Sequence, residues 1–192
     1  MAIFLRKNKE AREIFARVIK KGGIVLHPTD TVYGLAADAF NTGALKKLAF
    51  LKGRTSLKPF LVLATEDMLP SLASYIPFYL KKKWRDFLEK PLTAVLYAKV
   101  KRPFITSKGK IAIRIPSDEF LLDVIKIAGR PIASTSANPS GTVLPQEKLI
   151  SFFSWKVDLI ISGQSGGKKP STIVDFTSTP PVVLRKGEYK FI

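Results

Sequence analysis

The sequence contains no cysteine and a single histidine, His27. Without cysteine the chain can form neither a disulfide framework, nor a thiol nucleophile, nor a Cys-ligated zinc or iron–sulfur site. A single histidine excludes a metal site built on two histidines of one chain, and a Ser-His-Asp triad could be built only around that residue. His27 precedes a proline at the end of a predicted strand, and we interpret it as structural. We therefore expect the chemistry to come from hydroxyl, amide and cationic side chains.

The sequence also lacks a long hydrophobic run. Residues 2–5 are apolar, but Arg6 and Lys7 follow them, whereas the core of a signal peptide needs about 7–15 apolar residues. The longest apolar runs, such as residues 92–100, are broken well before the ~20 residues that a membrane span needs. These observations predict a soluble cytoplasmic protein that is neither exported nor inserted into a membrane.

Acidic residues are few: 15 Asp and Glu face 32 Lys and Arg, which gives a net charge of +17. Such a surplus points to anionic partners such as nucleotides, RNA or an anionic membrane surface, without choosing among them. The common nucleotide signatures are missing, because the chain has no Gly-x-Gly-x-x-Gly and residues 163–169 lack the P-loop spacing. If ATP binds, it binds through another arrangement.

With 192 residues, of which 46% are hydrophobic, the chain can bury one core, and we expect a single domain over residues 1–192. Apolar residues recur at helical spacing in several segments, and short apolar runs between them predict strands. Helices are predicted near residues 10–21, 45–51, 120–125 and 146–153, with two more between 66 and 89 that bury Phe78, Trp84, Phe87 and Leu88. Strands are predicted at 23–26, 31–37, 60–64, 92–98, 111–115, 132–133, 157–161, 171–176 and 182–185. This interleaving favours a layered α/β or α+β domain with a mixed sheet.

Polar and cationic residues gather in the loops between these elements. Residues 28–34, PTDTVYG, bring two hydroxyls and a carboxylate together, although a capped turn with Tyr33 in the core explains them equally well. Lys52, Arg54 and Lys58 follow the end of a predicted helix, where the helix dipole stabilises cations in any case. From local physics alone, the simpler interpretation is that these three cations lie on a surface exposed to solvent.

Three further segments place polar or charged residues within or directly beside predicted strands. Arg114 lies inside the apolar strand 111–115, and an arginine on the outer face of an edge strand is the ordinary explanation. Residues 134–141, STSANPSG, follow a short buried strand in a loop that suits an oxyanion or a phosphate, although turns favour the same residues. Residues 168–175, KKPSTIVD, form the last segment, with Arg185 and Gly187 beyond it.

Taken together, in this order and spacing, these segments resemble the YrdC-like family of threonylcarbamoyl-AMP synthases. The resemblance covers nearly the whole chain and is carried by residues 28–35 (PTDTVYGL), 52–54 (KGR), 58–59 (KP), 113–116 (IRIP), 134–141 (STSANPSG) and 170–175 (PSTIVD). It implies a single open, twisted, mixed-sheet domain with a large concave basic face. It also implies a nucleotidyltransferase that combines L-threonine, bicarbonate and ATP into threonylcarbamoyl-AMP and pyrophosphate. The product would serve N6-threonylcarbamoyladenosine modification of the tRNAs that read ANN codons.

The resemblance implies a role for each matching residue. The threonine contacts would be Thr31, Arg114, Ser134 and Ser171. The ATP contacts would be Lys52, Arg54, Lys58, Ser136, Asn138 and Arg185, with Lys52 and Arg54 as the catalytic cations. Leu63 departs from the family pattern, since some members have a histidine there near the threonine. No dedicated metal site is expected, because Mg²⁺ would be bound mostly by the triphosphate and water, with Asp30 as an outer partner.

The implied reaction suits these residue types. ATP, bicarbonate and a carboxylate are all anions, and gathering them needs fixed cations. An arginine fork can donate two parallel hydrogen bonds to the amino-acid carboxylate. A carbamate formed at the threonine amine can attack the α-phosphate, a step that depends mainly on alignment and charge neutralisation rather than on a strong base.

Two other functions compete with this one. A non-catalytic double-stranded RNA- or tRNA-binding protein would suit the charge, but it calls for aromatic residues near the basic loops, whereas most Phe and Trp fall at predicted core positions. A carbamoyl-transfer module, as in hydrogenase maturation proteins, belongs to longer chains with cysteines that this sequence lacks. Weak tRNA or double-stranded RNA binding, and proteins that transfer the threonylcarbamoyl group downstream, stay among the expected partners.

Overall fold

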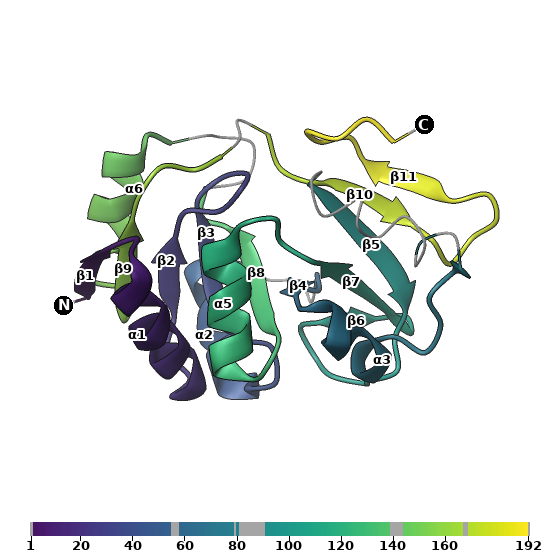
Figure 1. Ribbon diagram of the computed structural model, residues 1–192, viewed down its shortest axis with the longest axis horizontal. Coiled ribbons are helices and arrows are strands. Elements are labelled where there is room, and N and C mark those ends of the chain that lie inside the picture. Colours follow the sequence, from purple (N-terminus) through teal and green to yellow (C-terminus); the bar gives the residue numbers. More distant parts are fainter. Residues whose placement is uncertain are drawn as a thin grey trace.

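The centre of the molecule is one twisted mixed sheet (Figure 1), and the computed structural model describes residues 2–54, 58–78, 80, 91–138, 144–166 and 169–191. The strands are β1 (Ile3–Arg6), β2 (Val25–His27), β3 (Gly34–Asp38), β4 (Leu61–Leu63), β5 (Leu92–Tyr97), β6 (Thr106–Ser107), β7 (Lys110–Arg114), β8 (Ile132–Ser136), β9 (Leu159–Ser162), β10 (Thr172–Asp175) and β11 (Val182–Arg185). Their order is β1-β9-β2-β3-β8-β4-β7-β5-β10-β11, and β6 pairs with β7. The sheet contains parallel pairs such as β4 with β7 and antiparallel pairs such as β3 with β8, which confirms the mixed sheet.

Helices cover both faces of this sheet. They are α1 (Lys9–Lys20), α2 (Thr42–Leu51), α3 (Leu69–Leu72), α5 (Glu119–Ala128) and α6 (Gln146–Phe153), with a 3₁₀ turn at Glu66–Met68. Phe15 of α1 and Val124 of α5 share one buried cluster with Val25 and Ala36 of the sheet. Leu48 of α2 and Phe153 of α6 belong to a second cluster with the alternate sheet residues. Because side chains alternate along a strand, the two clusters mark the two faces of the sheet.

The two helices on the first face begin at polar caps that the sequence supplies. The side chain of Asn8 accepts a hydrogen bond from Ala11 N at 2.9 Å, and that of Asp118 accepts one from Phe120 N at 3.0 Å. Such caps satisfy backbone N–H groups that have no partner in the first turn of a helix. Helix α5 ends at Gly129, whose φ of 65° is in the left-handed region that glycine tolerates. The bounds of α1 and α5 therefore follow from local sequence.

The structure differs from the sequence-based expectations in several elements. Strands β1 and β6 were not predicted, and β8 extends through Ser136, because its backbone pairs with β3 in a region expected to be a loop. The first of the two helices predicted between residues 66 and 89 is only a 3₁₀ turn followed by α3. Phe78, expected in the core, is 76% exposed, so that prediction is wrong. Trp84, Phe87 and Leu88 lie outside the described residues, as do residues 139–141 of the segment 134–141 and residues 167–168 of the segment 163–169.

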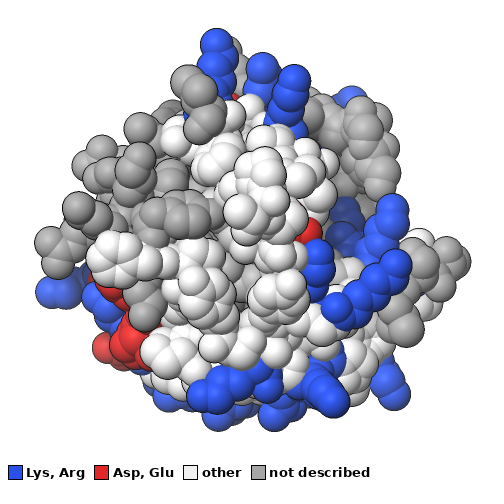
Figure 2. All heavy atoms as spheres, turned by 90° about the vertical axis from the view of Figure 1, so that its right-hand side faces the viewer, with Lys and Arg blue, Asp and Glu red and all other residues white. Residues whose placement is uncertain are grey.

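The surface shows the expected excess of positive charge. On the face that Figure 2 shows, Lys and Arg side chains surround a centre of uncharged residues, and Asp and Glu are sparse. Phe50 and Trp155 are 86% and 75% exposed, so these two aromatic residues do not fit the general expectation that Phe and Trp occupy the core. Among the residues that the structure describes, no helix has both the length and the hydropathy needed to cross a membrane.

Candidate functional site

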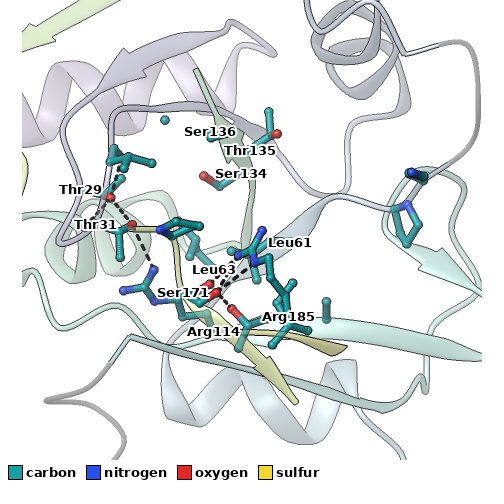
Figure 3. Close-up of a pocket in the computed structure, with 18 of the residues that line it drawn as sticks. Thr29, Thr31, Leu61, Leu63, Arg114, Ser134, Thr135, Ser136, Ser171 and Arg185 are labelled. Atoms are coloured by element: carbon teal, nitrogen blue, oxygen red, sulfur yellow. Dashed lines mark hydrogen bonds between the residues drawn. The ribbon is translucent and has the colours of Figure 1, made fainter. Parts of the chain in front are cut away.

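A cavity of about 280 Å³ brings together residues from segments far apart in the sequence (Figure 3). Its walls come from the loop before β3 and from β4, β5, β7, β8, β10 and β11. Eight of the residues predicted from the sequence line it: Thr31, Arg54, Lys58, Arg114, Ser134, Ser136, Ser171 and Arg185. The fold thus gathers most of the predicted threonine and ATP contacts around one space.

Arg114 lies in the interior of the sheet rather than at its edge. Strand β7 runs between β4 and β5, and the Arg114 side chain is only 4% exposed. The ordinary explanation of an arginine facing solvent from an edge strand is therefore wrong. Its guanidinium forms an ion pair with Asp30 and donates a hydrogen bond to Thr31 Oγ1 at 3.4 Å. A buried arginine held in this way offers its charge to the cavity in a fixed orientation.

Asp30 holds Arg114 and the neighbouring loop together. The Asp30 carboxylate also accepts hydrogen bonds from Ser117 Oγ at 2.7 Å and from Ser117 N at 3.2 Å. These contacts, like the ion pair with Arg114, all fall on Oδ2 of the carboxylate that the sequence suggested as an outer partner of Mg²⁺. Asp30 therefore acts in this structure as the counter-charge of Arg114.

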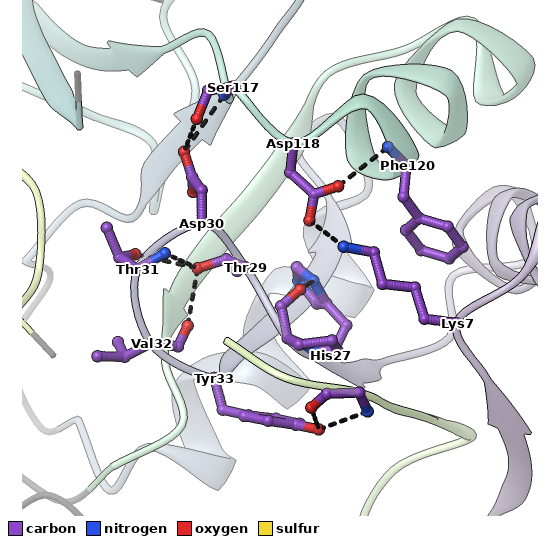
Figure 4. A network of polar contacts seen from close by, with 12 residues as sticks. Lys7, His27, Thr29, Asp30, Thr31, Val32, Tyr33, Ser117, Asp118 and Phe120 are labelled. Carbon is purple, nitrogen blue, oxygen red and sulfur yellow. Dashed lines mark hydrogen bonds and ion pairs between the residues drawn. The ribbon is translucent and has the colours of Figure 1, made fainter. Parts of the chain in front are cut away.

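Residues 28–34 form the turn that carries Thr31 to the cavity (Figure 4). The Thr29 hydroxyl donates to Val32 O at 2.8 Å and accepts from Thr31 N at 3.0 Å, and the two threonine hydroxyls are 3.0 Å apart. Tyr33 is buried, and its hydroxyl donates to Gly163 O at 2.7 Å. The turn is therefore capped as the sequence suggested, and the cap positions Thr31 at the cavity.

A second arginine lies close to Arg114. Arg185 Nε and Nη2 donate to Ser171 O at 3.1 and 2.8 Å, and Nη2 also lies 3.2 Å from Ser171 Oγ. The Ser171 hydroxyl is 2.8 Å from Thr93 Oγ1. The antiparallel pairing of β10 and β11 makes this contact, because it returns Arg185 to the start of β10. Arg185, predicted with the ATP contacts, therefore lies beside Ser171, which was predicted with the threonine contacts.

Arg54 and Lys58 line another part of the cavity. The Arg54 guanidinium lies 4.5 Å from the centre of the Phe60 ring and donates to Lys58 O at 2.9 Å and to Thr135 Oγ1 at 3.2 Å. Stacking on an aromatic ring fixes the plane of a guanidinium while leaving its charge available. This cation is therefore held near the end of β8.

Lys52 and Asn138 do not line the cavity, although both lie next to its wall. Lys52 Nζ donates to the carbonyl oxygens of Ser136 at 2.8 Å and Asn138 at 2.6 Å. The Asn138 side chain is buried, and its Oδ1 accepts from Leu144 N at 2.8 Å. Lys52 thus contacts the backbone at and just after the end of β8, and the Asn138 side chain contacts the backbone of Leu144.

The cations of the site lie in an environment that disfavours their charge. Burial is the first cause that lowers the pKa of Arg114, Arg185, Arg54 and Lys52 below their usual values. Arg114 adds to this effect on the pKa of Arg185, and Arg54 adds to it on the pKa of Lys52, because like charges repel. Asp30 opposes the effect on the pKa of Arg114. Partly buried, mutually repelling cations of this kind are stabilised by a bound anion.

Among the described residues that line the cavity, none carries a carboxylate. No group of three His, Cys, Asp or Glu that could hold a metal ion was found in the described part of the chain. The donor set of the cavity consists of guanidinium, ammonium and hydroxyl groups, which suits anionic oxygens.

Sequence reasoning missed some residues of the site. Thr93, Thr135 and Gly34 line the cavity but were not among the predicted contacts, whereas Leu63, which was singled out from the sequence, also lines it. Thr93 is the only Ser or Thr in the apolar run of β5, and an unexplained polar residue in such a run is a signal that could have found it. The pairing of Asp30 with Arg114 left no such signal, since the two residues are 84 positions apart.

Comparisons with known proteins show what the chain is similar to in sequence and in fold. The family model described as telomere recombination, Sua5/yciO/yrdC, matches residues 17–187. A threonylcarbamoyl-AMP synthase of Pyrococcus abyssi is 36% identical over 91% of this chain and 53% of its own length, so the chain spans about half of that relative. A Methanocaldococcus jannaschii relative is 33% identical over 94% of this chain and 87% of its own length. The crystal structure of P. abyssi Sua5 complexed with L-threonine superposes with a TM-score of 0.88 at 35% identity, over 97% of this chain and 57% of that one.

Proposed function

Because the chain belongs to the Sua5/YciO/YrdC family, we propose that it is a threonylcarbamoyl-AMP synthase. The observation that carries the proposal is the cavity, in which Arg54, Lys58, Arg114 and Arg185 surround hydroxyl groups and no described lining residue is acidic. Three anionic reactants, ATP, bicarbonate and L-threonine with its carboxylate, would each need such positive charge. The non-catalytic RNA-binding alternative is not favoured, since named relatives are synthases.

In this proposal the threonine carboxylate binds Arg114, while the hydroxyl groups of Thr31, Ser134 and Ser171 contact the rest of the amino acid. Arg114 is suited to this role because Asp30 orients its guanidinium, and a guanidinium can donate two hydrogen bonds to one carboxylate. Arg185 would lie between the two substrates, since it contacts Ser171 and its pKa is lowered by burial and by the nearby charge of Arg114. The triphosphate would occupy the side of Arg54, Lys58, Lys52, Ser136 and Asn138.

The reaction then proceeds in two steps. The threonine amine attacks bicarbonate, a nitrogen–carbon bond forms, and water leaves to give a carbamate. A carbamate oxygen attacks the α-phosphorus of ATP, an oxygen–phosphorus bond forms, and the bond to pyrophosphate breaks. The arginine and lysine side chains align the reactants and neutralise the charge that grows on the leaving pyrophosphate. No strong base is needed, so the lack of a cysteine or an exposed histidine is no obstacle.

The remaining reactants and partners also belong to this proposal. Mg²⁺ would arrive with ATP and be bound by phosphate oxygens and water, where it would offset the charge of the triphosphate. We expect the product to pass to a protein that transfers the threonylcarbamoyl group to tRNA, in the cytoplasm, where tRNA and ATP are both present.

The direct test is to incubate the protein with labelled bicarbonate, L-threonine, ATP and Mg²⁺ and to separate the adenylate by rapid chromatography. Pyrophosphate release should depend on threonine and bicarbonate together, and omission of either should reduce it to background. Equal release without threonine would refute the proposed function.

The two subsites can be separated with one variant each. R114K keeps the charge but loses the fork, and it should raise the apparent KM for threonine while leaving the affinity for a non-hydrolysable ATP analogue nearly unchanged. R54A should lower the affinity for the ATP analogue and lower kcat, because the leaving pyrophosphate loses a counter-charge. Loss of one charge-assisted contact corresponds to a ~10- to ~100-fold decrease in kcat/KM. The assignment would be contradicted if calorimetry showed that R114K lowers the affinity for the ATP analogue and leaves the affinity for threonine unchanged.

An accessory contact with RNA is favoured by a second surface feature. Phe50 is 86% exposed and, with Lys46, Lys47 and Lys156, lines a groove of about 660 Å³. Exposed rings beside lysines can stack on bases while the lysines neutralise phosphates. We propose weak, sequence-independent RNA binding that decreases steeply with salt. A titration at low and moderate salt tests it, and tight, salt-insensitive binding would contradict it.

A further inference from the structure

Thr93 is a fully buried threonine to which the proposed reaction gives no role. Its strand, β5, pairs in parallel with β10, and Thr93 lines the cavity together with Ser171 at the start of β10. Thr93 Oγ1 lies 2.8 Å from Ser171 Oγ, and within the described part of the protein this is the one hydrogen-bond partner of Thr93 Oγ1. Because Thr93 has no exposed surface, its hydroxyl cannot turn to solvent instead.

The burial of Thr93 decides the direction of this hydrogen bond. If Ser171 donated to Thr93, the hydrogen of the Thr93 hydroxyl would be left without an acceptor, which is costly in a buried position. Thr93 therefore donates to Ser171 Oγ. Arg185 Nη2 donates to the same oxygen at 3.2 Å. The two hydrogens occupy both lone pairs of Ser171 Oγ, so the hydrogen of Ser171 itself is left for a ligand in the cavity that Ser171 lines.

We propose that Thr93 is a positioning residue that makes the Ser171 hydroxyl a hydrogen-bond donor toward an oxygen of the bound amino acid. With both lone pairs occupied, Ser171 Oγ cannot accept a hydrogen bond from an ammonium group. The positive charge of Arg185 on the same serine also repels an ammonium group. An acceptor oxygen suits this point, and L-threonine offers one in its side-chain hydroxyl and two in its carboxylate.

The inference rests on the proposed function, because it takes the ligand of the cavity to be L-threonine. Its consequence is that Ser171 orients the substrate by an oxygen and leaves the amine to other groups. The amine is the atom that reacts with bicarbonate in the proposed function, so it must stay accessible. A donor fixed before the ligand arrives costs less on binding than one that must first be ordered.

Two substitutions of Thr93 test the direction of the hydrogen bond. T93V keeps the shape of the side chain but removes the hydroxyl, so the hydrogen of Ser171 is no longer fixed toward the ligand. We expect calorimetry to show that T93V binds L-threonine about 3- to 10-fold more weakly, the size of one net hydrogen bond. T93S keeps the hydroxyl and should stay within about twofold of the wild type. If Ser171 instead donated to Thr93, T93V would release that hydrogen, and threonine affinity would stay the same or rise.

Two controls separate this role from a general effect on the fold. Thr65 is also buried, but its Oγ1 has no hydrogen-bond partner among the described residues and it does not line the cavity. T65V is therefore a matched change that should leave threonine affinity unaltered. In an S171A background, T93V should have no additional effect, because the residue through which Thr93 acts is gone. The affinity of T93V for an ATP analogue should equal that of the wild type.

L-2-Aminobutyrate, which lacks the side-chain hydroxyl of threonine, identifies the oxygen. If T93V weakens the binding of threonine only, the Ser171 hydrogen binds the threonine hydroxyl, whereas equal weakening of both ligands assigns it to the carboxylate. Equal losses in T93V and T93S, additive losses with S171A, or an unchanged or higher threonine affinity of T93V would overturn the inference. A wild-type protein that binds no threonine by calorimetry would instead refute the proposed function, together with the role given to Ser171.

Discussion

The ion pair between Asp30 and Arg114 allows a quantitative prediction for D30N. The Arg114 side chain is 4% exposed and that of Asp30 is 15% exposed, so the substitution leaves a buried guanidinium without its counter-charge. Breaking a buried pair by removal of one partner costs about 3–5 kcal/mol. The asparagine keeps an acceptor for Ser117, and Asp30 is partly hydrated, so we expect a loss of about 2–3 kcal/mol in the free energy of unfolding. For a chain of this size that corresponds to a decrease of about 4–12 °C in Tm.

The assay is urea and thermal unfolding at neutral pH, with D123N as the matched control. Asp123 pairs with Arg12, but both side chains are about a third exposed, at 34% and 28%. Such a pair contributes at most ~1 kcal/mol, so D123N should shift the transition little. Sulfate should narrow the difference between D30N and the wild type, because an anion can take the place of the carboxylate beside Arg114. If D30N loses no more stability than D123N, Asp30 does not hold Arg114 as the structure indicates.

Two more predictions concern stability. Burial lowers the pKa of His27 from its ordinary 6.5 to about 4, so between these pH values the unfolded chain binds more protons than the folded one. The free energy of unfolding should therefore fall by up to ~3 kcal/mol as the pH falls from 6.5 to 4. Urea unfolding at a series of pH values should show that H27F lacks this part of the pH dependence. A Cβ on Gly187 would lie 2.2 Å from the carbonyl oxygen of Pro170, so G187A should lower Tm and loosen Arg185 from Ser171. A Cβ on Gly43, in helix α2, would lie 3.3 Å from the capping oxygen of Asn41, so G43A should change Tm much less. Equal Tm values for the two glycine variants would contradict this reasoning.

The sequence by itself determined those features that depend on neighbouring residues. Asn8 and Asp118 cap α1 and α5 within three residues of their partners, and the helical spacing of Phe15 and Val124 places both in the core. Short apolar runs likewise predicted the strands β2, β5 and β7 near their observed positions. Hydrogen bonds of this kind and the alternation of buried faces act over a few residues, so a local pattern is enough to predict them.

Only the tertiary structure decided which charges meet. Whether Arg114 points to solvent or into the sheet depends on which strands lie beside β7, and that order joins segments with no local relation. The pairing of β10 with β11 brings Arg185 to Ser171, and the turn before β3 brings Asp30 to Arg114 across 84 residues. The burial predicted for Phe78 was likewise wrong. The spacing of apolar residues shows that one face of a helix is apolar, but it does not show whether another element covers that face. Burial and pairing over long distances are properties of the packed sheet, and for this reason the candidate site was predictable as a set of residues but not as a geometry.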